Sequence, residues 1–249
     1  MTFDLVVATV GRTAELERFL ASLEAQTHRD FRVLVVDQNP DDCVAPLLDE
    51  RAVHLRSPLG LSRARNTALP HLRADVVGFP DDDCIYPRDL LERVAARLAT
   101  GLDGVTGREP WWTTEGATLT RENLWNRAIS FTIFLRRSVV ERVGAFDERL
   151  GLPRSSGEEI DYLIRALDSG ARVEYDPTIV IEHPKKDVDL SAVGARDGAS
   201  LGYILRKHRY PQRVFARMLV RPLAGVVAEP RRARFHIETL RGRWRGYRS

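Results

Sequence analysis

Three consecutive carboxylates, Asp81, Asp82 and Asp83, follow the apolar residues 76–79 after a single proline, Pro80. A buried strand that ends in acidic residues places them at a sheet edge, where open α/β sheets bind ligands. Adjacent carboxylates repel one another, and they stay ionised together most easily beside Mg²⁺ or Mn²⁺, which prefer oxygen ligands. Because alternate residues of an extended chain point to the same side, Asp81 and Asp83 could share one ion while Asp82 faces elsewhere. These residues leave an alternative equally open, an acidic loop that caps a helix beginning near Asp89.

A second acidic group, Glu158, Glu159 and Asp161, stands at the start of a helix that the apolar spacing predicts over residues 158–168. Acidic side chains are favoured at this position by the positive end of the helix dipole, which explains some of the three.

Two further sets of side chains have both a functional and a structural interpretation. Trp111 and Trp112 lie in residues 109–116, whose composition predicts a loop. Paired tryptophans in a loop could stack on a sugar ring or fill a gap beneath the loop. His183 follows the apolar residues 179–181, and a lone histidine near a strand end is either a structural residue or a metal ligand.

The elements that must position these residues alternate along the first half of the chain. Strands are predicted over residues 4–9, 31–36, 53–55 and 76–79. One helix is predicted after Thr13 as its N-cap, and a second in the segment that ends at Glu50. Two more are predicted over residues 62–69, with Ser62 as the N-cap, and over residues 89–98. Strands that alternate with helices predict an α/β fold with a largely parallel sheet.

The second half of the chain is less regular. Strands are predicted over residues 104–107, 131–135 and 171–175, the last closing at Asp176 and Pro177, and a flexible loop over 151–157 precedes the helix 158–168. From residue 190 the chain is predicted to be helical and increasingly basic. We therefore expect one α/β domain over residues 1–189 and a basic helical extension over residues 190–249.

The net charge of +3 conceals an asymmetry between the body and the C-terminal segment. Residues 206–249 contain 13 Lys and Arg and two acids, a net charge of +11, so residues 1–205 carry −8. A basic helical segment with an apolar face predicts contact with an anionic membrane surface, with packing on the body as the alternative. No nucleic-acid motif accompanies the arginines, so no nucleic-acid partner is expected.

The sequence also indicates in which cellular compartment the protein is expected. The start of the chain has no basic leader before an apolar run, and no apolar run approaches the length needed to cross a bilayer. Cys43 and Cys84 are not at a metal-binding spacing, which predicts a reducing compartment without a disulfide framework. We expect a cytoplasmic protein, with attachment to the inner face of the membrane through its basic segment.

Several separated motifs occur together in one order. They are residues 8–12 (Ala-Thr-Val-Gly-Arg), 35–37 (Val-Val-Asp), 60–69 (Gly-Leu-Ser-Arg-Ala-Arg-Asn-Thr-Ala-Leu), 79–83 (Phe-Pro-Asp-Asp-Asp), 144–151 (Gly-Ala-Phe-Asp-Glu-Arg-Leu-Gly) and 156–165 (Ser-Gly-Glu-Glu-Ile-Asp-Tyr-Leu-Ile-Arg). Their order and spacing resemble the inverting glycosyltransferases of family 2, over about residues 4–183. The resemblance implies the GT-A fold, a Rossmann-like mixed, mostly parallel sheet flanked by helices. Residues 1–100 would then form the donor half and 101–189 the acceptor half of the domain.

The resemblance also implies roles in donor binding. Thr9, Arg12 and Asp37 match positions around the nucleotide base and ribose, and Arg65 matches a nucleotide-contacting position. Asp81 and Asp83 match the Asp-x-Asp motif, in which Asp83 would hold Mn²⁺ or Mg²⁺ and Asp81 would bind ribose or metal. His183 stands where some members of the fold supply a third metal ligand. Asp82, Trp111, Trp112 and Glu158 are further expected to contact a substrate.

The catalytic base of the family lies in a Glu-Asp pair at a helix start. This chain has Glu158 and Glu159 there, so Glu159 occupies the usual aspartate position. Glutamate is one methylene longer and has nearly the same intrinsic pKa, so it could serve the same role. Asp161 is the next candidate base on that helix.

The expected reaction is transfer of a sugar, with inversion, from a nucleoside-diphosphate sugar to a hydroxyl of a glycan or lipid-linked acceptor, as in cell-surface polysaccharide synthesis. UDP is the expected nucleotide by family frequency, with GDP and dTDP open. Two alternatives remain at this point. One is a nucleotidyltransferase, although residues 10–13 are too short for its Gly-rich loop, and the other is a catalytically inactive nucleotide-sugar-binding protein.

Overall fold

The computed structural model describes residues 1–153, 155–184 and 189–249, and these form two compact units. The first unit consists of residues 1–146 and 162–184, and the second of residues 147–161 and 189–249. Arg154, in the predicted loop 151–157, and residues 185–188, at the end of the predicted domain 1–189, lie outside the described residues. Among the described residues, no helix combines the length and the apolar character that a membrane span requires.

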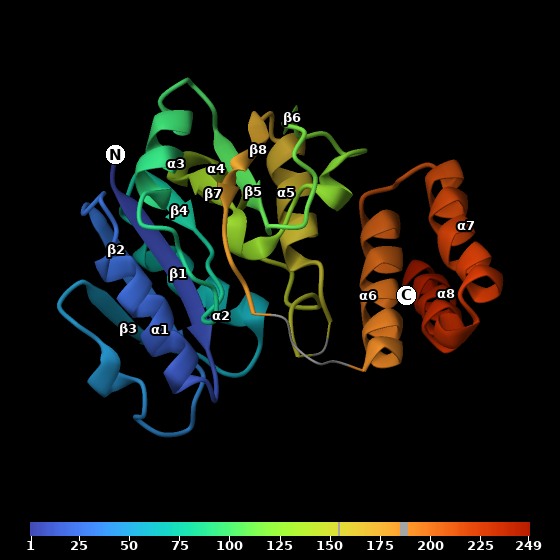
Figure 1. Cartoon of the computed structure of the whole chain (residues 1–249), viewed down its shortest axis with the longest axis horizontal. Coiled ribbons are helices and arrows are strands. Elements are labelled where there is room, and N and C mark those ends of the chain that lie inside the picture. The colour runs from blue at the N-terminus through green and yellow to red at the C-terminus, as the bar shows by residue number, and fades with distance from the viewer. Residues whose placement is uncertain (154, 185–188) are drawn as a thin grey trace. The chain divides into compact units, whose positions relative to one another are not determined.

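The first unit is built on one eight-stranded sheet with the order β3-β2-β1-β4-β7-β5-β8-β6 (Figure 1). The strands are β1 (Phe3–Thr9), β2 (Phe31–Asp37), β3 (Ala52–Arg56), β4 (Val76–Gly78), β5 (Gly104–Arg108), β6 (Ala117–Thr118), β7 (Phe134–Arg136) and β8 (Val173–Val180). β7 pairs antiparallel with both β4 and β5, and β6 pairs antiparallel with β8, whereas the other pairings are parallel. The predicted mixed, mostly parallel sheet is confirmed.

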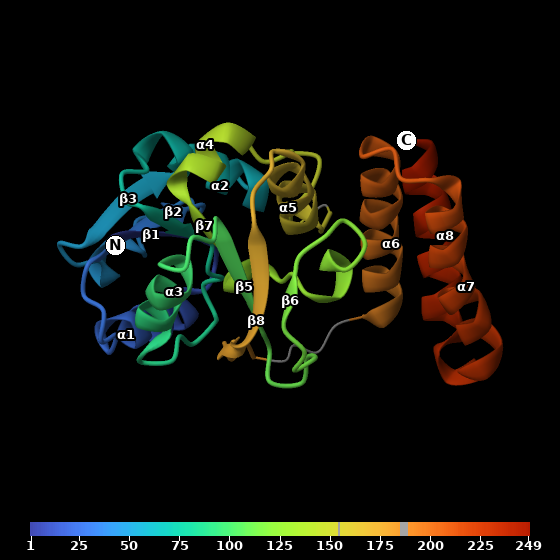
Figure 2. The ribbon, with the colours of Figure 1, turned by 90° about the horizontal axis from the view of Figure 1, so that it is seen from above.

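Helices cover both faces of the sheet. They are α1 (Thr13–Glu24), α2 (Leu61–Ala68), α3 (Leu90–Leu98) and α4 (Arg137–Val143), and α5 (Glu158–Asp168) follows later in the chain. In Figure 2, α1 and α3 lie on one face of the sheet and α2 and α4 on the other. The apolar residues that α1 and α3 present at helical spacing, including Phe19 and Val94, are buried in one core cluster with residues of the strands, and α3 packs against β5 and β8.

The predicted helix before Glu50 is wrong. Only a three-residue 3₁₀ turn, Ala45–Leu47, forms in this segment. Pro46 has no N–H to donate, and its ring disfavours a helical conformation at the residue before it. The apolar residues here therefore pack as a loop.

The predicted N-caps Thr13 and Ser62 are also wrong. Each lies inside its helix, because the observed N-cap residue is Arg12 for α1 and Gly60 for α2. Neither Arg12 nor Gly60 makes a side-chain hydrogen bond to its helix. Gly60 has a φ of +139°, which side chains rarely tolerate, so glycine sets the entry into α2.

Two strand predictions need correction. The strand predicted over residues 131–135 begins only at Phe134, because Ser130–Thr132 form a 3₁₀ turn. The strand predicted to close at Asp176 and Pro177 continues through them to Val180. The ladder between β5 and β8 shifts register at this point, and proline is tolerated in a strand where a bulge interrupts the pairing.

The second unit contains α6 (Leu190–Lys207), α7 (Gln212–Ala228) and α8 (Ala233–Arg248), which confirms the predicted helical character beyond residue 190. α6 and α8 pack at very short range through glycines. A Cβ added to Gly198 would overlap the backbone of Thr239, and one added to Gly246 would overlap the backbone of Ala199. Small residues permit this approach, and α8 also packs against α7.

Candidate active site

The acidic segment 81–83 is held at the carboxyl end of β1. Asp81 forms an isolated parallel bridge with Ala8, the penultimate residue of β1. Two residues beyond Asp83, Ile85 bridges Glu182, and its N–H donates to the Glu182 carbonyl at 2.9 Å. These two backbone contacts fix the acidic segment on one side to β1 and on the other to the residue that precedes His183.

Asp81, Asp83 and His183 form a cluster of ligand-type atoms that all lie within 4.8 Å of one another. Nε2 of His183 is 3.0 Å from Oδ1 of Asp83. The imidazole ring stacks on Phe131, with ring centroids 4.9 Å apart and an interplanar angle of 5°, which fixes its orientation. The residues that the sequence singled out separately therefore meet at one point.

This donor set suits a hard or borderline divalent cation. Carboxylate oxygens are ligands for Mg²⁺ and Mn²⁺, and imidazole nitrogen is a common ligand of transition metals. Ligands on opposite sides of a Mg²⁺ ion lie about 4.2 Å apart, so the cluster has nearly the dimensions of a metal site. The alternative that the acids cap the following helix is wrong, because α3 begins behind Asp89 and no side chain caps it.

Asp82 is not a member of this cluster, although residues 82 and 83 form a turn and not the extended chain that the predicted alternation assumed. Its carboxylate accepts hydrogen bonds from Oγ1 of Thr9 and Nη1 of Arg12, both at 2.9 Å. Burial raises the pKa of Asp82 above its ordinary value, against the opposing effects of the Arg12 charge and the Thr9 hydrogen bond. The Arg12 guanidinium also donates to Oδ2 of Asp83 at 3.2 Å, and its side chain is two-fifths exposed.

Asp37 ends β2 beside Thr9, its register partner on β1, and is fully buried. Oδ1 accepts from the backbone and the side-chain amide of Asn39, and Oδ2 lies near His54 and Arg56. Burial acts to raise the pKa of Asp37, but the hydrogen bonds from Asn39 and His54 and the charge of Arg56 hold it below its usual range. Asp37 is therefore a charged anchor for the loop that follows β2, and its contact with a nucleotide stays a prediction.

Arg65 of α2 is buried next to Asp81. The side chain is only 1% exposed, donates to Oγ of Ser130, and has Nη2 3.7 Å from Oδ1 of Asp81. Its guanidinium also lies 5.7 Å from the ring centre of Phe79 and 5.4 Å from that of Phe146. The observed contacts support Asp81, and a direct contact of Arg65 with the nucleotide stays a prediction.

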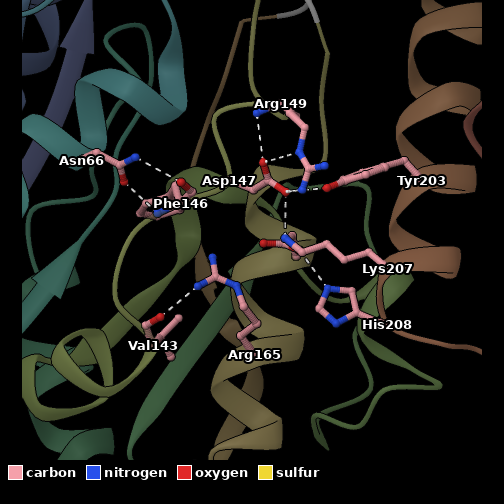
Figure 3. Close-up of polar contacts among 10 residues, drawn as sticks. Asn66, Val143, Phe146, Asp147, Arg149, Arg165, Tyr203, Lys207 and His208 are labelled. Atoms are coloured by element: carbon pink, nitrogen blue, oxygen red, sulfur yellow. Dashed lines mark hydrogen bonds and ion pairs between the residues drawn. The ribbon is translucent and has the colours of Figure 1, made fainter. Parts of the chain in front are cut away.

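The neighbouring Asn66 clamps the chain at Phe146. Its side-chain amide donates to the Phe146 carbonyl at 3.0 Å and its Oδ1 accepts from the Phe146 N–H at 2.7 Å, as Figure 3 shows. Trp111 and Trp112 lie in the predicted loop between β5 and β6, with Trp111 54% exposed and Trp112 partly buried. Their contact with a sugar stays a prediction.

The acidic group at the start of α5 belongs to the second unit, and its three members differ in burial. Asp161 is fully buried and lies 2.6 Å from Nζ of Lys207 and 2.8 Å from Nε2 of His208, at the end of α6. Glu158 is also buried, whereas Glu159 is partly exposed. Of the three carboxylates, Glu159 is the one that solvent reaches best.

Lys207 joins Asp161 to a second carboxylate, Asp147. Nζ of Lys207 lies 2.9 Å from Oδ2 of Asp147, which also accepts from Tyr203 at 2.7 Å and from Arg149 (Figure 3). Burial acts to raise the pKa of Asp147, but the three hydrogen-bond donors hold it well below its usual range. Sequence patterns did not identify Tyr203, Lys207 and His208, because in sequence they are ordinary residues of a basic helix.

The model of the family described as Glycosyl transferase family 2 matches residues 4–151, more than half of the chain. The chain belongs to glycosyltransferase family 2. The match covers the acidic segment 81–83 and ends before Glu158 and His183.

Curated relatives of this family 2 chain are glycosyltransferases. The pre-mycofactocin glycosyltransferase of Mycobacterium tuberculosis is 28% identical over 205 residues, which cover 72% of this chain and 42% of that protein. Glycosyltransferase AglE of Haloferax volcanii is 26% identical over 211 residues, or 75% of this chain and 68% of AglE. The chain thus spans less than half the length of the mycobacterial relative.

Solved structures share the fold of this family 2 chain. The mannosyltransferase PcManGT from Pyrobaculum calidifontis, solved in complex with GDP-Man and Mn²⁺, has a TM-score of 0.65 at 20% identity and is matched over 84% of this chain and 64% of PcManGT. TarS of S. aureus has a TM-score of 0.65 at 17% identity over 96% of this chain and 55% of TarS. The predicted GT-A fold is confirmed.

Proposed function

We propose that this family 2 chain is an inverting glycosyltransferase that moves a sugar from a nucleoside-diphosphate donor to an acceptor hydroxyl. The observation that carries the proposal is the convergence of Asp81, Asp83 and His183 at the carboxyl end of β1. Curated relatives named as glycosyltransferases support the class of reaction.

Asp83, Asp81 and His183 would hold Mn²⁺ or Mg²⁺, and a bound cation would offset the negative charge that develops on the leaving diphosphate. Thr9, Arg12 and Asp37 would surround the base and ribose. Arg12 is suited to this role because its guanidinium is partly exposed beside Asp82 and Asp83. Arg65 would hold Asp81 in place, since its guanidinium is buried against it.

Glu159 would act as the general base. Its carboxylate would take the proton from the acceptor hydroxyl as that oxygen attacks the anomeric carbon, so that the nucleotide leaves from the opposite face and the configuration inverts. Glu158 would contact the acceptor. Asp161 is unsuited to the role of base, because it is fully buried and held by Lys207 and His208.

The donor half would comprise about residues 1–100, and the acceptor half about residues 101–189, where Trp111 and Trp112 could stack on a sugar. UDP remains the proposed nucleotide, and GDP is its main competitor because PcManGT was solved with GDP-Man. The proposed acceptor is a glycan or a lipid-linked sugar of a cell-surface polysaccharide, used at the cytoplasmic face of a membrane.

A thermal-shift series tests nucleotide and metal binding. UDP, GDP, dTDP and CDP are each added with Mn²⁺ or with EDTA, because a ligand at 100 times its Kd stabilises the native state by about 2.7 kcal/mol. For a unit of this size that is a rise in Tm of about 5 to 10 °C. We expect one nucleotide to raise Tm with Mn²⁺ and not with EDTA. A panel with no shift would contradict the proposed donor site.

Asp83→Ala tests the placement of this site. We expect the variant to lose the Mn²⁺-dependent shift, because it removes a central member of the cluster. Glu17→Ala, which removes an exposed carboxylate of α1, is the matched control and should keep the shift. A full Mn²⁺-dependent shift in Asp83→Ala would refute the assignment of the metal site.

A further inference from the structure

Helix α7 presents an exposed row of apolar side chains. Val220, Leu223 and Val227 are 62%, 61% and 81% exposed, although they are aliphatic. Together with the exposed Ala216 they follow the spacing i, i+4, i+7, i+11, which places them on one face of the helix. We call these four residues the apolar strip.

The apolar strip is not the face that packs in the second unit. The opposite side of α7 carries Phe215, Pro222 and Gly225, which are buried. Phe215 stacks on Tyr247 of α8 with ring centroids 4.0 Å apart, and a Cβ added to Gly225 would overlap the ring of His236. The helix therefore has a packed side and, separate from it, an apolar side without cover within the unit.

A row of arginines runs along one edge of the apolar strip. Arg213, Arg217 and Arg221 are spaced four residues apart on α7 and all are exposed. Among the described residues, none of the three forms an ion pair. Most other charges of residues 206–249 are also positive, so no acidic surface of this segment neutralises the row.

We infer that α7 lies in the surface of an anionic membrane, with the apolar strip inserted among the lipids and the arginine row at the head groups. An interfacial helix has this arrangement of a narrow apolar face beside basic residues. Anionic lipid head groups complement the arginine row. At 17 residues with three arginines, the helix can lie along a membrane but is unsuited to cross it.

Two other occupants of the strip fit these observations less well. A second copy that covered the strip symmetrically would bring the same surface of both chains together, and with it both arginine rows. A nucleic acid would satisfy the arginines through its phosphates and would leave Val220, Leu223 and Val227 in water. An anionic lipid surface accommodates both features at once.

Vesicle sedimentation with the full chain tests the inference, using phosphatidylcholine vesicles with and without 30% phosphatidylglycerol. The two test variants are Val220→Ser/Leu223→Ser/Val227→Ser and Arg213→Gln/Arg217→Gln/Arg221→Gln. The control, Arg18→Gln/Arg29→Gln/Arg142→Gln, removes the same charge from exposed positions of the first unit. Circular dichroism checks that each variant is folded. Neither donor nor metal is present, so the result does not depend on the proposed transfer reaction.

We expect the wild-type chain to bind the anionic vesicles and not the neutral ones. Each arginine near an anionic surface contributes about fivefold to binding, so the arginine variant should bind about a hundredfold more weakly. The apolar variant should lose at least about tenfold, and the control should bind like the wild type.

Absence of binding to anionic vesicles by the wild type would overturn the inference. So would a control variant that loses as much binding as the arginine variant, because the effect would then be one of net charge. Light scattering that shows a dimer abolished by the apolar variant, with vesicle binding unchanged, would assign the strip to a second copy. Binding of a single-stranded RNA that depends on the arginines, without vesicle binding, would assign the row to nucleic acid.

Discussion

Replacing Lys207 by methionine tests how α6 holds the first turn of α5. Methionine keeps most of the apolar stem but removes the ammonium group that lies between Asp147 and Asp161. Both carboxylates are largely or fully buried, with side-chain exposures of 11% and 0%. The variant therefore leaves two carboxylates near one another without the cation that joins them.

The magnitude follows from the partners that remain. Removing one member of a buried ion pair costs about 3 to 5 kcal/mol. His208 still contacts Asp161, while Tyr203 and Arg149 still donate to Asp147. We therefore expect Lys207→Met to lower the free energy of unfolding by about 2 to 3 kcal/mol, less than the full range.

Urea denaturation followed by circular dichroism measures this loss, and hydrogen exchange locates it. The amide of Asp161, which donates to the Gly157 carbonyl in the first turn of α5, should exchange faster in the variant. Arg149→Met is the matched control, because it removes a second cation from Asp147 at a largely exposed position and should cost at most about 1 kcal/mol. A Lys207→Met variant no less stable than Arg149→Met would refute the structural role of Lys207.

Three further predictions concern acid stability, helix packing and the loop clamp. The pKa of Asp147 lies below its unfolded value of about 3.9, so Asp147 contributes stability above about pH 4 that is lost as the pH falls. Asp147→Asn should therefore reduce the dependence of the free energy of unfolding on pH between about pH 2 and 4, measured by denaturation at a series of pH values. An unchanged slope would contradict this. Gly246→Ala should lower the free energy of unfolding, measured by calorimetry, by about 2 to 4 kcal/mol, because its Cβ would overlap the Ala199 backbone. Gly116→Ala, where a Cβ has ordinary contacts, should be nearly neutral, and equal losses in the two variants would refute the role of close packing. Asn66→Ala should speed hydrogen exchange at Phe146 and lower stability by about 1 to 2 kcal/mol, and unchanged exchange would exclude the clamp.

The regular parts of the fold were predictable because their patterns are local. β1 and β2 each contain an apolar run, residues 5–8 and 33–36, and α5 was predicted with its observed ends from four apolar residues at helical spacing. The failures have tertiary or backbone causes. Pro46 disfavours the helix that the composition predicted before Glu50, and only a 3₁₀ turn forms there. The path of β8 through Pro177 depends on a register shift against β5.

The cluster of Asp81, Asp83 and His183 was predictable only through the resemblance to a family, since the strands β5 to β8 and about 100 residues separate the histidine from the acids. The supporting residues were not predictable. Nothing in the sequence distinguishes Lys207 from other basic residues of the C-terminal segment, and Arg65 gives no sign that its charge is buried behind Asp81.

The most direct test of the central claim compares the wild type with Glu159→Gln. Release of nucleoside diphosphate from the donor sugar is measured with Mn²⁺ and acceptor, and the Kd of the nucleotide is measured in parallel. Loss of the general base should slow transfer by about 10² to 10⁴-fold while the nucleotide Kd stays the same. Full transfer activity in Glu159→Gln would contradict the account.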